Sequence, residues 1–254
     1  THLNLREARE NLKRQKAETE SLVHILSHDL MNPISAMLGF IHLAAMLPSY
    51  DDPDTQELWK NLEIAANQQE SIVSHVREMR ALETGKKKVP LTPVNLADVI
   101  DTSMAIFQAR LKVKEITLQL TLDRTDNWGV KAEPVSLTHN VVSNLISNAI
   151  KFSFPGSTIS IEAKNEGGFV HLIIEDKGIG IPPSILPNLF KTDVPTSRPG
   201  TSRETGTGFG MPLVKKYVDV YQGEIQVESR AQEDFPQDHG TRICLSLKPA
   251  PLKK

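Results

Sequence analysis

Several features that would narrow the function are scarce or absent in this chain of 254 residues. Cys244 is its only cysteine, so neither an internal disulfide nor a cysteine-built metal site can form, and we expect a reducing, cytoplasmic compartment. No apolar run approaches the ~18 residues of a membrane span, and the charged opening THLNLREARENLKRQK is unlike a signal peptide. We therefore expect any membrane anchor or upstream sensor domain to lie outside these residues.

Strong net charge and the common nucleotide signatures are missing as well. The formal net charge of -2 gives no overall basic field, so neither nucleic acid nor an anionic membrane is expected as a partner. No G-x-x-x-x-G-K-[ST] occurs, and the glycine-rich segment near residue 206 follows no strand of a βαβ unit. With 39% hydrophobic and 24% charged residues, the composition is that of an ordinary protein of one or two domains.

The first third of the chain has helical periodicity. Apolar residues recur at spacings of four and three between Leu22 and Ala44, and again between Leu58 and Met79 after the break PSYDDP. This pattern predicts a helical hairpin within residues 1–88. Because one hairpin cannot shield both apolar seams from water, we expect two copies of the chain to form a dimeric four-helix bundle.

The pattern changes after the basic stretch GKKKVPLTP, residues 85–93, which we interpret as a linker. Segments 116–122, 157–163, 169–176, 223–229 and 241–247 have the pattern of strands, and segments 97–111, 134–152 and 210–221 that of helices. The predicted fold class is therefore α+β, with a second domain over residues 89–254. Thr192 to Thr207 is rich in Pro, Ser, Thr and Gly, which is typical of a mobile loop.

Polar side chains in the second half are spaced as a binding site requires. Asn144, Asn148 and Lys151 lie four and three residues apart, so a helix brings two carboxamides and an ammonium onto one face. The strand HLIIED is followed by DKGIGIP, where Asp176 can accept a hydrogen bond from an adenine amino group. Taken alone, the first pattern is more typical of an ordinary solvated helix face, and the second is also found in a tight turn at the end of a strand.

Two glycine clusters accompany these residues. Gly178 and Gly180 allow the backbone to approach a ligand closely. Gly206, Gly208 and Gly210 precede an apolar helix and offer backbone N–H groups and a helix N-terminus to phosphates. A single cluster of this kind is weak evidence, but the order of the motifs along the chain is more specific.

The ordered motifs resemble the ATP-binding domain shared by histidine kinases, gyrase, the MutL repair protein and a heat-shock chaperone, an α/β sandwich. By this resemblance the cofactors are ATP and Mg²⁺, Asn148 holds the Mg²⁺, Asn144 and Lys151 contact the phosphates, and Asp176 recognises adenine. Thr192 to Thr207 would be the lid over ATP. The remaining residues assigned to the nucleotide site are Phe152, Gly178, Gly180, Phe190, Gly206, Thr207, Gly208, Phe209 and Gly210.

His28 opens the segment HDLMNP in the first predicted helix. The helical repeat places it almost opposite the apolar stripe, with Asn32 one turn along and Asp29 beside it. Three such polar residues are by themselves unremarkable, and His24 has a similar geometric position. His28 differs because His28, Asp29 and Pro33 match the H-[ED]-x-x-x-P phosphoacceptor box of histidine kinases.

The two resemblances together cover about residues 20 to 249, in the order found in histidine kinases. They imply autophosphorylation on His28, transfer to an aspartate of a response regulator receiver domain, and a homodimer. Asp29 would polarise the imidazole, and Asn32 would hold a water for the reverse, phosphatase reaction. Two alternatives stay open: a catalytically weak dimeric signalling scaffold, and an ATPase clamp of the same superfamily.

Overall fold

The computed structural model describes residues 34–43, 53–85, 87–123, 126–194, 196–204 and 206–252. The chain divides into two compact units. The first takes residues up to Arg77 together with Lys191–Pro195, and the second takes Glu78–Phe190 and Thr196–Lys254. All strands that the structure describes belong to the second unit.

Up to Arg77, the described part of the first unit is helical. Residues 34–43 form a helix, and α2 spans Pro53–Glu83. Along α2 the seam residues Ala65, Ile72 and Val76 are buried, which agrees with the predicted spacing. The two-helix prediction is confirmed for these residues, whereas the N-terminal part of the first predicted helix, with His28, Asp29 and Asn32, lies outside the described residues.

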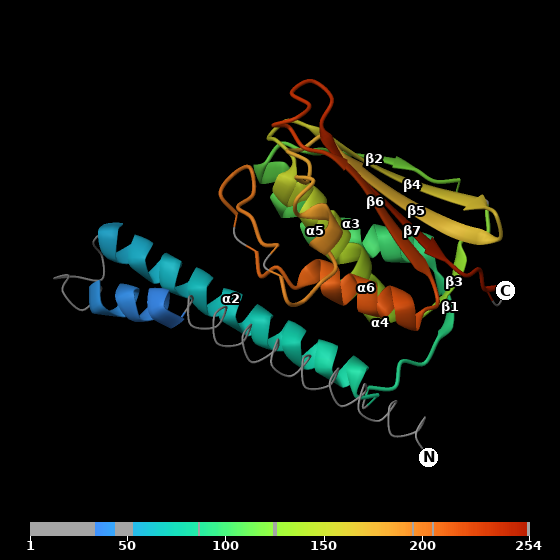
Figure 1. Ribbon diagram of the computed structural model, residues 1–254, viewed down its shortest axis with the longest axis horizontal. Coiled ribbons are helices and arrows are strands. Elements are labelled where there is room, and N and C mark those ends of the chain that lie inside the picture. Colours follow the sequence, from blue (N-terminus) through green and yellow to red (C-terminus); the bar gives the residue numbers. More distant parts are fainter. Residues whose placement is uncertain are drawn as a thin grey trace, which may run out of the picture. The chain divides into compact units, whose positions relative to one another are not determined.

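The second unit is built on a five-stranded sheet in the order β2-β4-β5-β7-β6 (Figure 1). β2 runs parallel to β4, and all other neighbours are antiparallel. In β4 the side chains of Ile159, Ile161 and Ala163 are buried while their neighbours are more exposed, as expected for a sheet with one face on the core. The five predicted strands are confirmed as β2 (Thr117–Thr121), β4 (Thr158–Glu166), β5 (Phe169–Asp176), β6 (Glu224–Arg230) and β7 (Gly240–Leu247).

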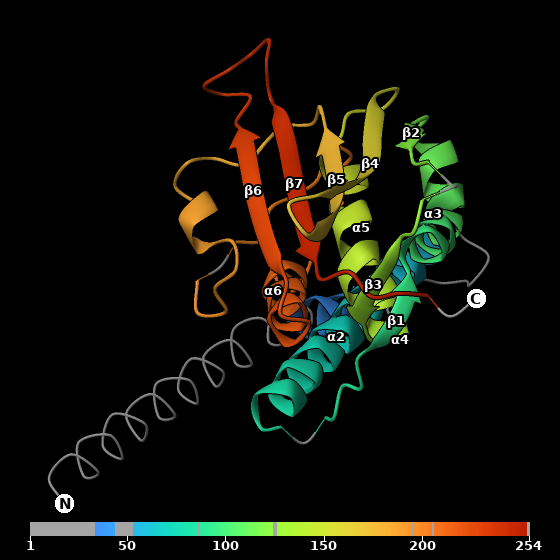
Figure 2. The ribbon, with the colours of Figure 1, turned by 90° about the vertical axis from the view of Figure 1, so that its right-hand side faces the viewer.

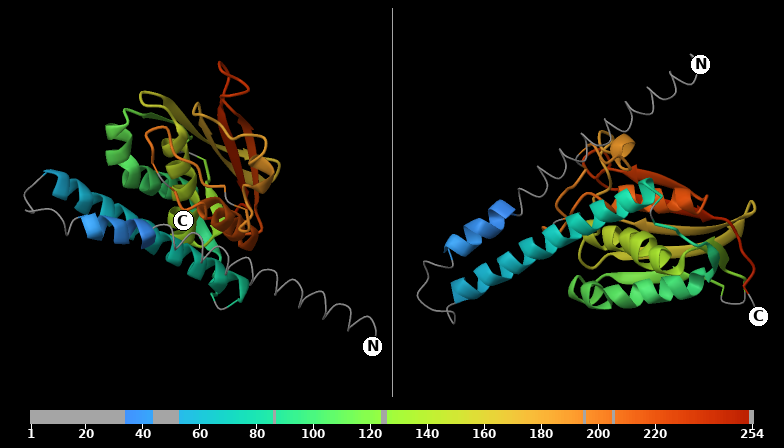
Figure 3. Two further views of the ribbon diagram at one scale, coloured as in Figure 1. Left: turned by 60° about the vertical axis from the view of Figure 1, so that its left-hand side comes forward. Right: turned by 90° about the horizontal axis from the view of Figure 1, so that it is seen from below.

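Three helices cover one face of this sheet, as Figures 1 and 2 show: α3 (Leu96–Val113), α5 (Ser143–Phe152) and α6 (Gly210–Val220). The three lie next to one another in the right-hand view of Figure 3. The Asn95 side chain caps α3 by accepting a hydrogen bond from the Ala97 N–H at 3.1 Å. The core between helices and sheet includes the fully buried Leu96, Ile100, Leu145, Ile146, Ile150, Leu172, Val214 and Leu245.

Two details differ from the sequence prediction. The interpreted linker ends two residues early, because Thr92–Asn95 forms β1, which pairs with β3 (Gly129–Ala132) in a second small sheet. The single helix predicted over 134–152 is divided into α4 (Pro134–Ser136), a π-helical segment over Leu137–Val142, and α5. A 3-10 turn at Leu186–Asn188 completes the described elements, and no described helix is both long and apolar enough to cross a membrane.

Candidate nucleotide site

α5 carries four of the predicted site residues. Its apolar side chains Leu145, Ile146, Ala149 and Ile150 are buried. Asn144 and Asn148 on the remaining face are only half-buried. The spacing predicted that these asparagines share one face of a helix, and this is confirmed, because the opposite face of α5 is buried in the core.

The DxGxG turn follows directly from the end of β5. Asp176 pairs with Thr241 of β7, and its Oδ1 accepts a hydrogen bond from the Gly178 N–H at 2.8 Å. A Cβ at Gly178 would collide with the Phe152 carbonyl oxygen. Gly180 has φ +64°, and a side chain there would strike the carbonyl of Arg230. The turn thus needs glycine to pack against the end of α5.

Asp176 is a buried carboxylate, only 7% exposed. Burial raises its pKa from 3.8 to about 6, against the lowering effect of the Gly178 and Thr241 N–H groups. It is therefore mostly ionised at neutral pH but poorly solvated. Such a group is suited to accept a hydrogen bond from a ligand amino group.

The glycine segment before α6 lies against the polar face of α5. A Cβ on Gly206 would stand 2.6 Å from Nζ of Lys151, and one on Gly210 would stand 2.7 Å from Oδ1 of Asn144. Gly208 has φ +77°, a conformation that favours glycine. The structure therefore brings together the asparagine helix and the glycine segment, as the sequence predicted, and the N-terminus of α6 starts at this point.

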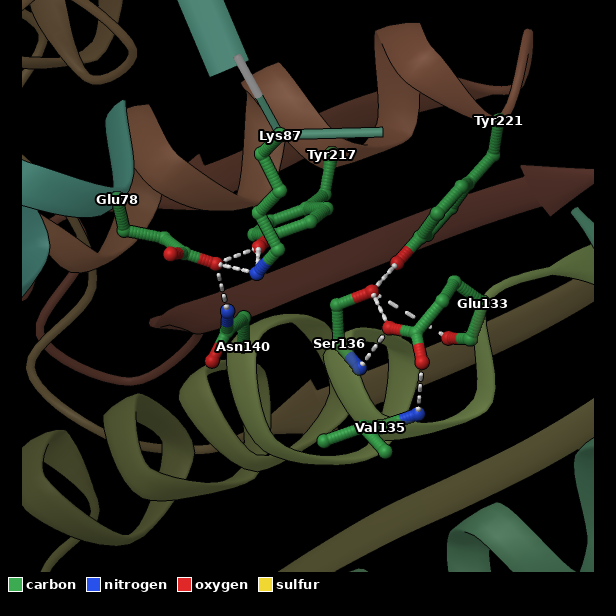
Figure 4. Close-up of polar contacts among 8 residues, drawn as sticks. All are labelled: Glu78, Lys87, Glu133, Val135, Ser136, Asn140, Tyr217 and Tyr221. Atoms are coloured by element: carbon green, nitrogen blue, oxygen red, sulfur yellow. Dashed lines mark hydrogen bonds and ion pairs between the residues drawn. The ribbon is translucent and has the colours of Figure 1, made fainter. Parts of the chain in front are cut away.

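A polar network holds α6 in place on its other side (Figure 4). Oε1 of Glu78 accepts hydrogen bonds from the Tyr217 hydroxyl, from Lys87 and from Asn140, the last at 3.3 Å. Burial alone would raise the pKa of Glu78, but the bonds from Lys87 and Tyr217 outweigh it and keep the pKa below its usual value. One turn further along α6, the Tyr221 hydroxyl lies 2.7 Å from Ser136 Oγ. These contacts fix α6 against the π-helical segment that leads into α5.

The C-terminal carbonyls of α5 are all satisfied, and most of their donors come from other parts of the site. The Ser153 N–H bonds the Ala149 carbonyl at 3.0 Å, and the Ile179 N–H of the DxGxG turn bonds the Phe152 carbonyl at 3.1 Å. The Lys114 ammonium bonds the carbonyls of residues 150 and 151, and residue 201 of the lid also bonds residue 151. Helix ends leave these acceptors unpaired unless other groups supply donors, so α5 links α3, the turn and the lid.

The predicted lid, residues 192–207, contains no helix or strand in its described part, which agrees with the prediction of a loop. Arg198 nevertheless has fixed partners: its Nη2 donates to the Gly180 carbonyl at 2.7 Å, and its guanidinium lies 5.0 Å from the Phe152 ring centre. Nζ of Lys151 lies 4.7 Å from the same centre. Burial lowers the pKa of both cations. Phe152 thus contacts two cationic side chains, which suits a site for a polyanion.

Sequence reasoning missed three residues that shape the site. Lys114 and Glu204 form an ion pair between α3 and the lid, and His239 Nδ1 lies 2.6 Å from the Gly178 carbonyl. None belongs to a motif, so only the folded structure reveals them. Phe190 is half-buried next to the lid in sequence. Across the described residues, no group of three or more His, Cys, Asp or Glu side chains could hold a metal ion.

Two family profiles match the chain in the order of its two predicted parts. Residues 18–85 match the His Kinase A (phospho-acceptor) domain, and residues 133–251 match the histidine kinase-, DNA gyrase B- and HSP90-like ATPase. This chain belongs to the sensor histidine kinases. The resemblance drawn from the motifs is therefore confirmed.

Individual histidine kinases are similar over most of this chain. Sensor protein GacS of Pseudomonas syringae pv. syringae is 25% identical over 94% of the chain, but the match spans only 26% of GacS. Histidine kinase ThkA, solved with the response regulator protein TrrA, has a TM-score of 0.71 at 21% identity. The match covers 100% of this chain and 69% of the ThkA chain. Full-length ShkA, solved with AMPPNP, has a TM-score of 0.63 at 19% identity, and the match covers 92% of this chain and 47% of the ShkA chain. At these identities the solved structures support the fold.

Proposed function

We propose that this kinase binds Mg-ATP at the α5 site and transfers the γ-phosphoryl group to His28. The observation that carries the proposal is the meeting of α5 with the glycine segment, where Lys151 faces Gly206 and Asn144 faces Gly210. Backbone N–H groups and an ammonium gathered at a helix N-terminus are suited to a triphosphate. Asp176 would accept the adenine amino group, and the complex of ShkA with AMPPNP supports the same class of ligand.

Transfer requires an in-line approach of the imidazole to the γ-phosphorus and neutralisation of the phosphate charge. Neutral His28 would attack through one ring nitrogen, forming a P–N bond as the bond to the ADP leaving group breaks. Asp29 would accept a hydrogen bond from the other ring nitrogen and thereby increase the electron density on the attacking nitrogen. Lys151 and Arg198 would supply positive charge on the protein side.

The residues present fit a magnesium ion held mainly by the nucleotide. Mg²⁺ favours oxygen ligands, and in nucleotide sites it uses a few protein groups together with phosphate oxygens and water. The half-buried Asn148 carboxamide makes no hydrogen bond with the described residues and lies one turn from both Asn144 and Lys151. When bound, Mg²⁺ would neutralise phosphate charge, with Asn148 as its protein ligand.

Three further parts of the proposal concern assembly. We place the phosphoacceptor domain at residues 1–88 and the ATP-binding domain at 89–254. Exposed apolar side chains on the helical unit, at Leu38, Ile41, Leu43, Ile64 and Val73, support a homodimer joined through the hairpins. The complex of ThkA with TrrA supports a response regulator receiver domain as the second acceptor.

Titration with Mg-ATP and self-labelling from γ-labelled ATP, measured on one preparation, test this function. We expect saturable binding and label that stays on the chain. Release of free phosphate without labelled protein would indicate an ATPase clamp instead. A chain that neither binds nor labels would indicate a signalling scaffold, and either result would contradict the proposal.

Asn148→Asp should change the metal dependence of ATP binding. A carboxylate adds negative charge beside the phosphates, so binding at low Mg²⁺ should weaken roughly tenfold while high Mg²⁺ restores part of it. Titrations with ATP at several Mg²⁺ concentrations measure the effect. Asn165→Asp, in β4, is the matched control and should leave the Mg²⁺ dependence unchanged; equal curves for all three proteins would refute Asn148 as the ligand.

Asn32→Ala should separate self-phosphorylation of the kinase from dephosphorylation of the receiver domain. Hydrolysis of an aspartyl phosphate needs a water held in line with phosphorus, which the carboxamide would supply, whereas transfer to His28 needs no water. We expect self-phosphorylation to persist and phosphatase activity towards the phosphorylated receiver to fall about 100-fold. Asp29→Ala should damage the forward reaction more. Equal loss of both rates in Asn32→Ala would exclude the water-holding role.

A further inference from the structure

The lid turn, residues 200–204, is attached to the rest of the domain through a buried lysine. Lys114, at the C-terminus of α3, is 7% exposed, and its Nζ lies 2.6 Å from Oε1 of Glu204. Its other two acceptors are the carbonyls of Ile150 and Lys151, at 2.7 and 3.0 Å. Each of the three ammonium protons therefore has an acceptor.

The three bonds bring the lid turn to the end of α5. Burying an ammonium is costly unless it is paired and hydrogen-bonded. Two of its acceptors belong to the C-terminus of α5, where the helix dipole also favours a cation. Among the residues that the structure describes, Glu204 supplies the only carboxylate that bonds Lys114, so the position of the lid turn and the burial of Lys114 depend on each other.

Glu204 also organises the turn that contains it. Its backbone carbonyl accepts the Gly200 N–H, and its Oε2 accepts the Ser202 N–H, each at 2.8 Å. Burial alone would raise the pKa of Glu204, but the bonds from Lys114 and the backbone outweigh it and keep the pKa below its usual value. The Glu204 side chain is therefore ionised at neutral pH and joins the turn to Lys114.

The lid turn is also in direct contact with α5. The Thr201 N–H donates to the Lys151 carbonyl at 3.1 Å. A Cβ on Gly200 would lie 2.6 Å from the same carbonyl and would collide with Glu204. Only glycine fits at position 200, so the lid backbone approaches α5 as closely as it can.

The turn lies between two lid residues that contact the nucleotide site. Arg198, two residues before it, contacts Phe152 and the Gly180 carbonyl. Gly206, two residues after Glu204, lies beside the Lys151 ammonium. Holding the turn at Glu204 therefore limits the movement of both flanks.

We propose that Lys114, acting through Glu204, is a positioning residue that holds the lid over the bound nucleotide and slows its release. This inference rests on the proposed function, because it assumes that Mg-ATP occupies the α5 site. Neither residue needs to touch the nucleotide. Loss of the pair frees the lid without altering Asp176 or the DxGxG turn.

Glu204→Gln tests the inference, since it removes the charge but keeps the size and the hydrogen-bonding oxygen. In the ligand-free protein, the amide protons of Gly200 and Thr201 should exchange with solvent about tenfold faster. Mg-ATP should dissociate about tenfold faster in stopped-flow displacement, while the association rate changes little. Glu162→Gln, in the partly exposed pair of Lys164 and Glu162 at 3.0 Å, is the matched control and should change neither rate.

The double variant Lys114→Met with Glu204→Gln should dissociate Mg-ATP no faster than the more affected single variant, because Lys114→Met already removes the ion pair that Glu204→Gln weakens. Unchanged amide exchange in Glu204→Gln, or faster exchange with unchanged Mg-ATP dissociation, would overturn the inference. If the wild-type chain bound no Mg-ATP, the proposed function would fail, and the exchange comparison would still decide whether the pair holds the lid.

Discussion

Replacing His28 with alanine should reduce phosphate incorporation from γ-labelled ATP to background, while binding of Mg-ATP stays unchanged. The reason is that the acceptor and the nucleotide site lie in different parts of the chain. His28 falls within the phosphoacceptor match over residues 18–85, and every nucleotide-contacting residue that we propose falls within the ATPase match over 133–251.

His24→Ala is the matched control for this experiment. It lies four residues before His28 in the sequence but lacks the acidic neighbour and the proline of the phosphoacceptor box. The His24 variant should therefore label at close to the wild-type rate. Persistent labelling of His28→Ala, or loss of ATP binding in a folded His28→Ala protein, would contradict the assignment.

Asp176→Asn should have a large effect of two kinds: it should abolish most nucleotide binding and stabilise the ligand-free protein. The buried carboxylate is the proposed acceptor for the adenine amino group, so its loss should weaken ATP binding about 100-fold or more. A site that evolved for binding often carries such a destabilising group.

The stability change follows from the raised pKa of Asp176, which is about 6 in the folded protein. Because the pKa of Asp176 is higher in the folded than in the unfolded protein, the protonated carboxyl group favours folding. This stabilising contribution is complete below about pH 4 and is lost as the pH rises to about 6. Above that pH, keeping the ionised group buried costs on the order of 3 kcal/mol. Asp176→Asn should therefore be the more stable protein at pH 7.5, with the advantage shrinking between pH 6 and pH 4.

Denaturant unfolding at several pH values, together with ATP titration, measures both effects. Glu224→Gln is the control, because Glu224 is an exposed carboxylate on β6 that does not contribute to the raised pKa of Asp176. It should alter neither nucleotide affinity nor the pH profile appreciably. An Asp176→Asn protein that binds ATP normally, or that is less stable than wild type at pH 7.5, would refute this account of the residue.

The parts of the fold that could be predicted from the sequence depend on local periodicity. Alternation within segments such as FVHLIIED identified the five central strands, and the spacing of Asn144, Asn148 and Lys151 identified a polar face on α5. The glycines of DKGIGIP and GTGFGM were informative because close backbone approach leaves no room for a side chain. These patterns depend only on residues that are close in the sequence, so they can be recognised without knowledge of the tertiary structure.

What the sequence did not reveal depends on contacts between distant residues. β1 has four residues and is defined by pairing with β3, more than thirty residues away. The Lys114 ammonium is placed by its bond to Glu204, ninety residues further on. His239 likewise reaches Gly178 from a different loop. None of these interactions has a periodic pattern, and each residue type is common on protein surfaces.

The central claim, phosphoryl transfer from ATP to His28, is tested most directly by locating the phosphate on the protein. The chain is incubated with Mg-ATP, digested at mildly alkaline pH and analysed by mass spectrometry, with half of the sample first treated with acid. The account predicts one phosphate on the His28 imidazole that acid removes, because a P–N bond is acid-labile. A phosphate on His24, or on a hydroxyl group where it survives acid, would contradict the account.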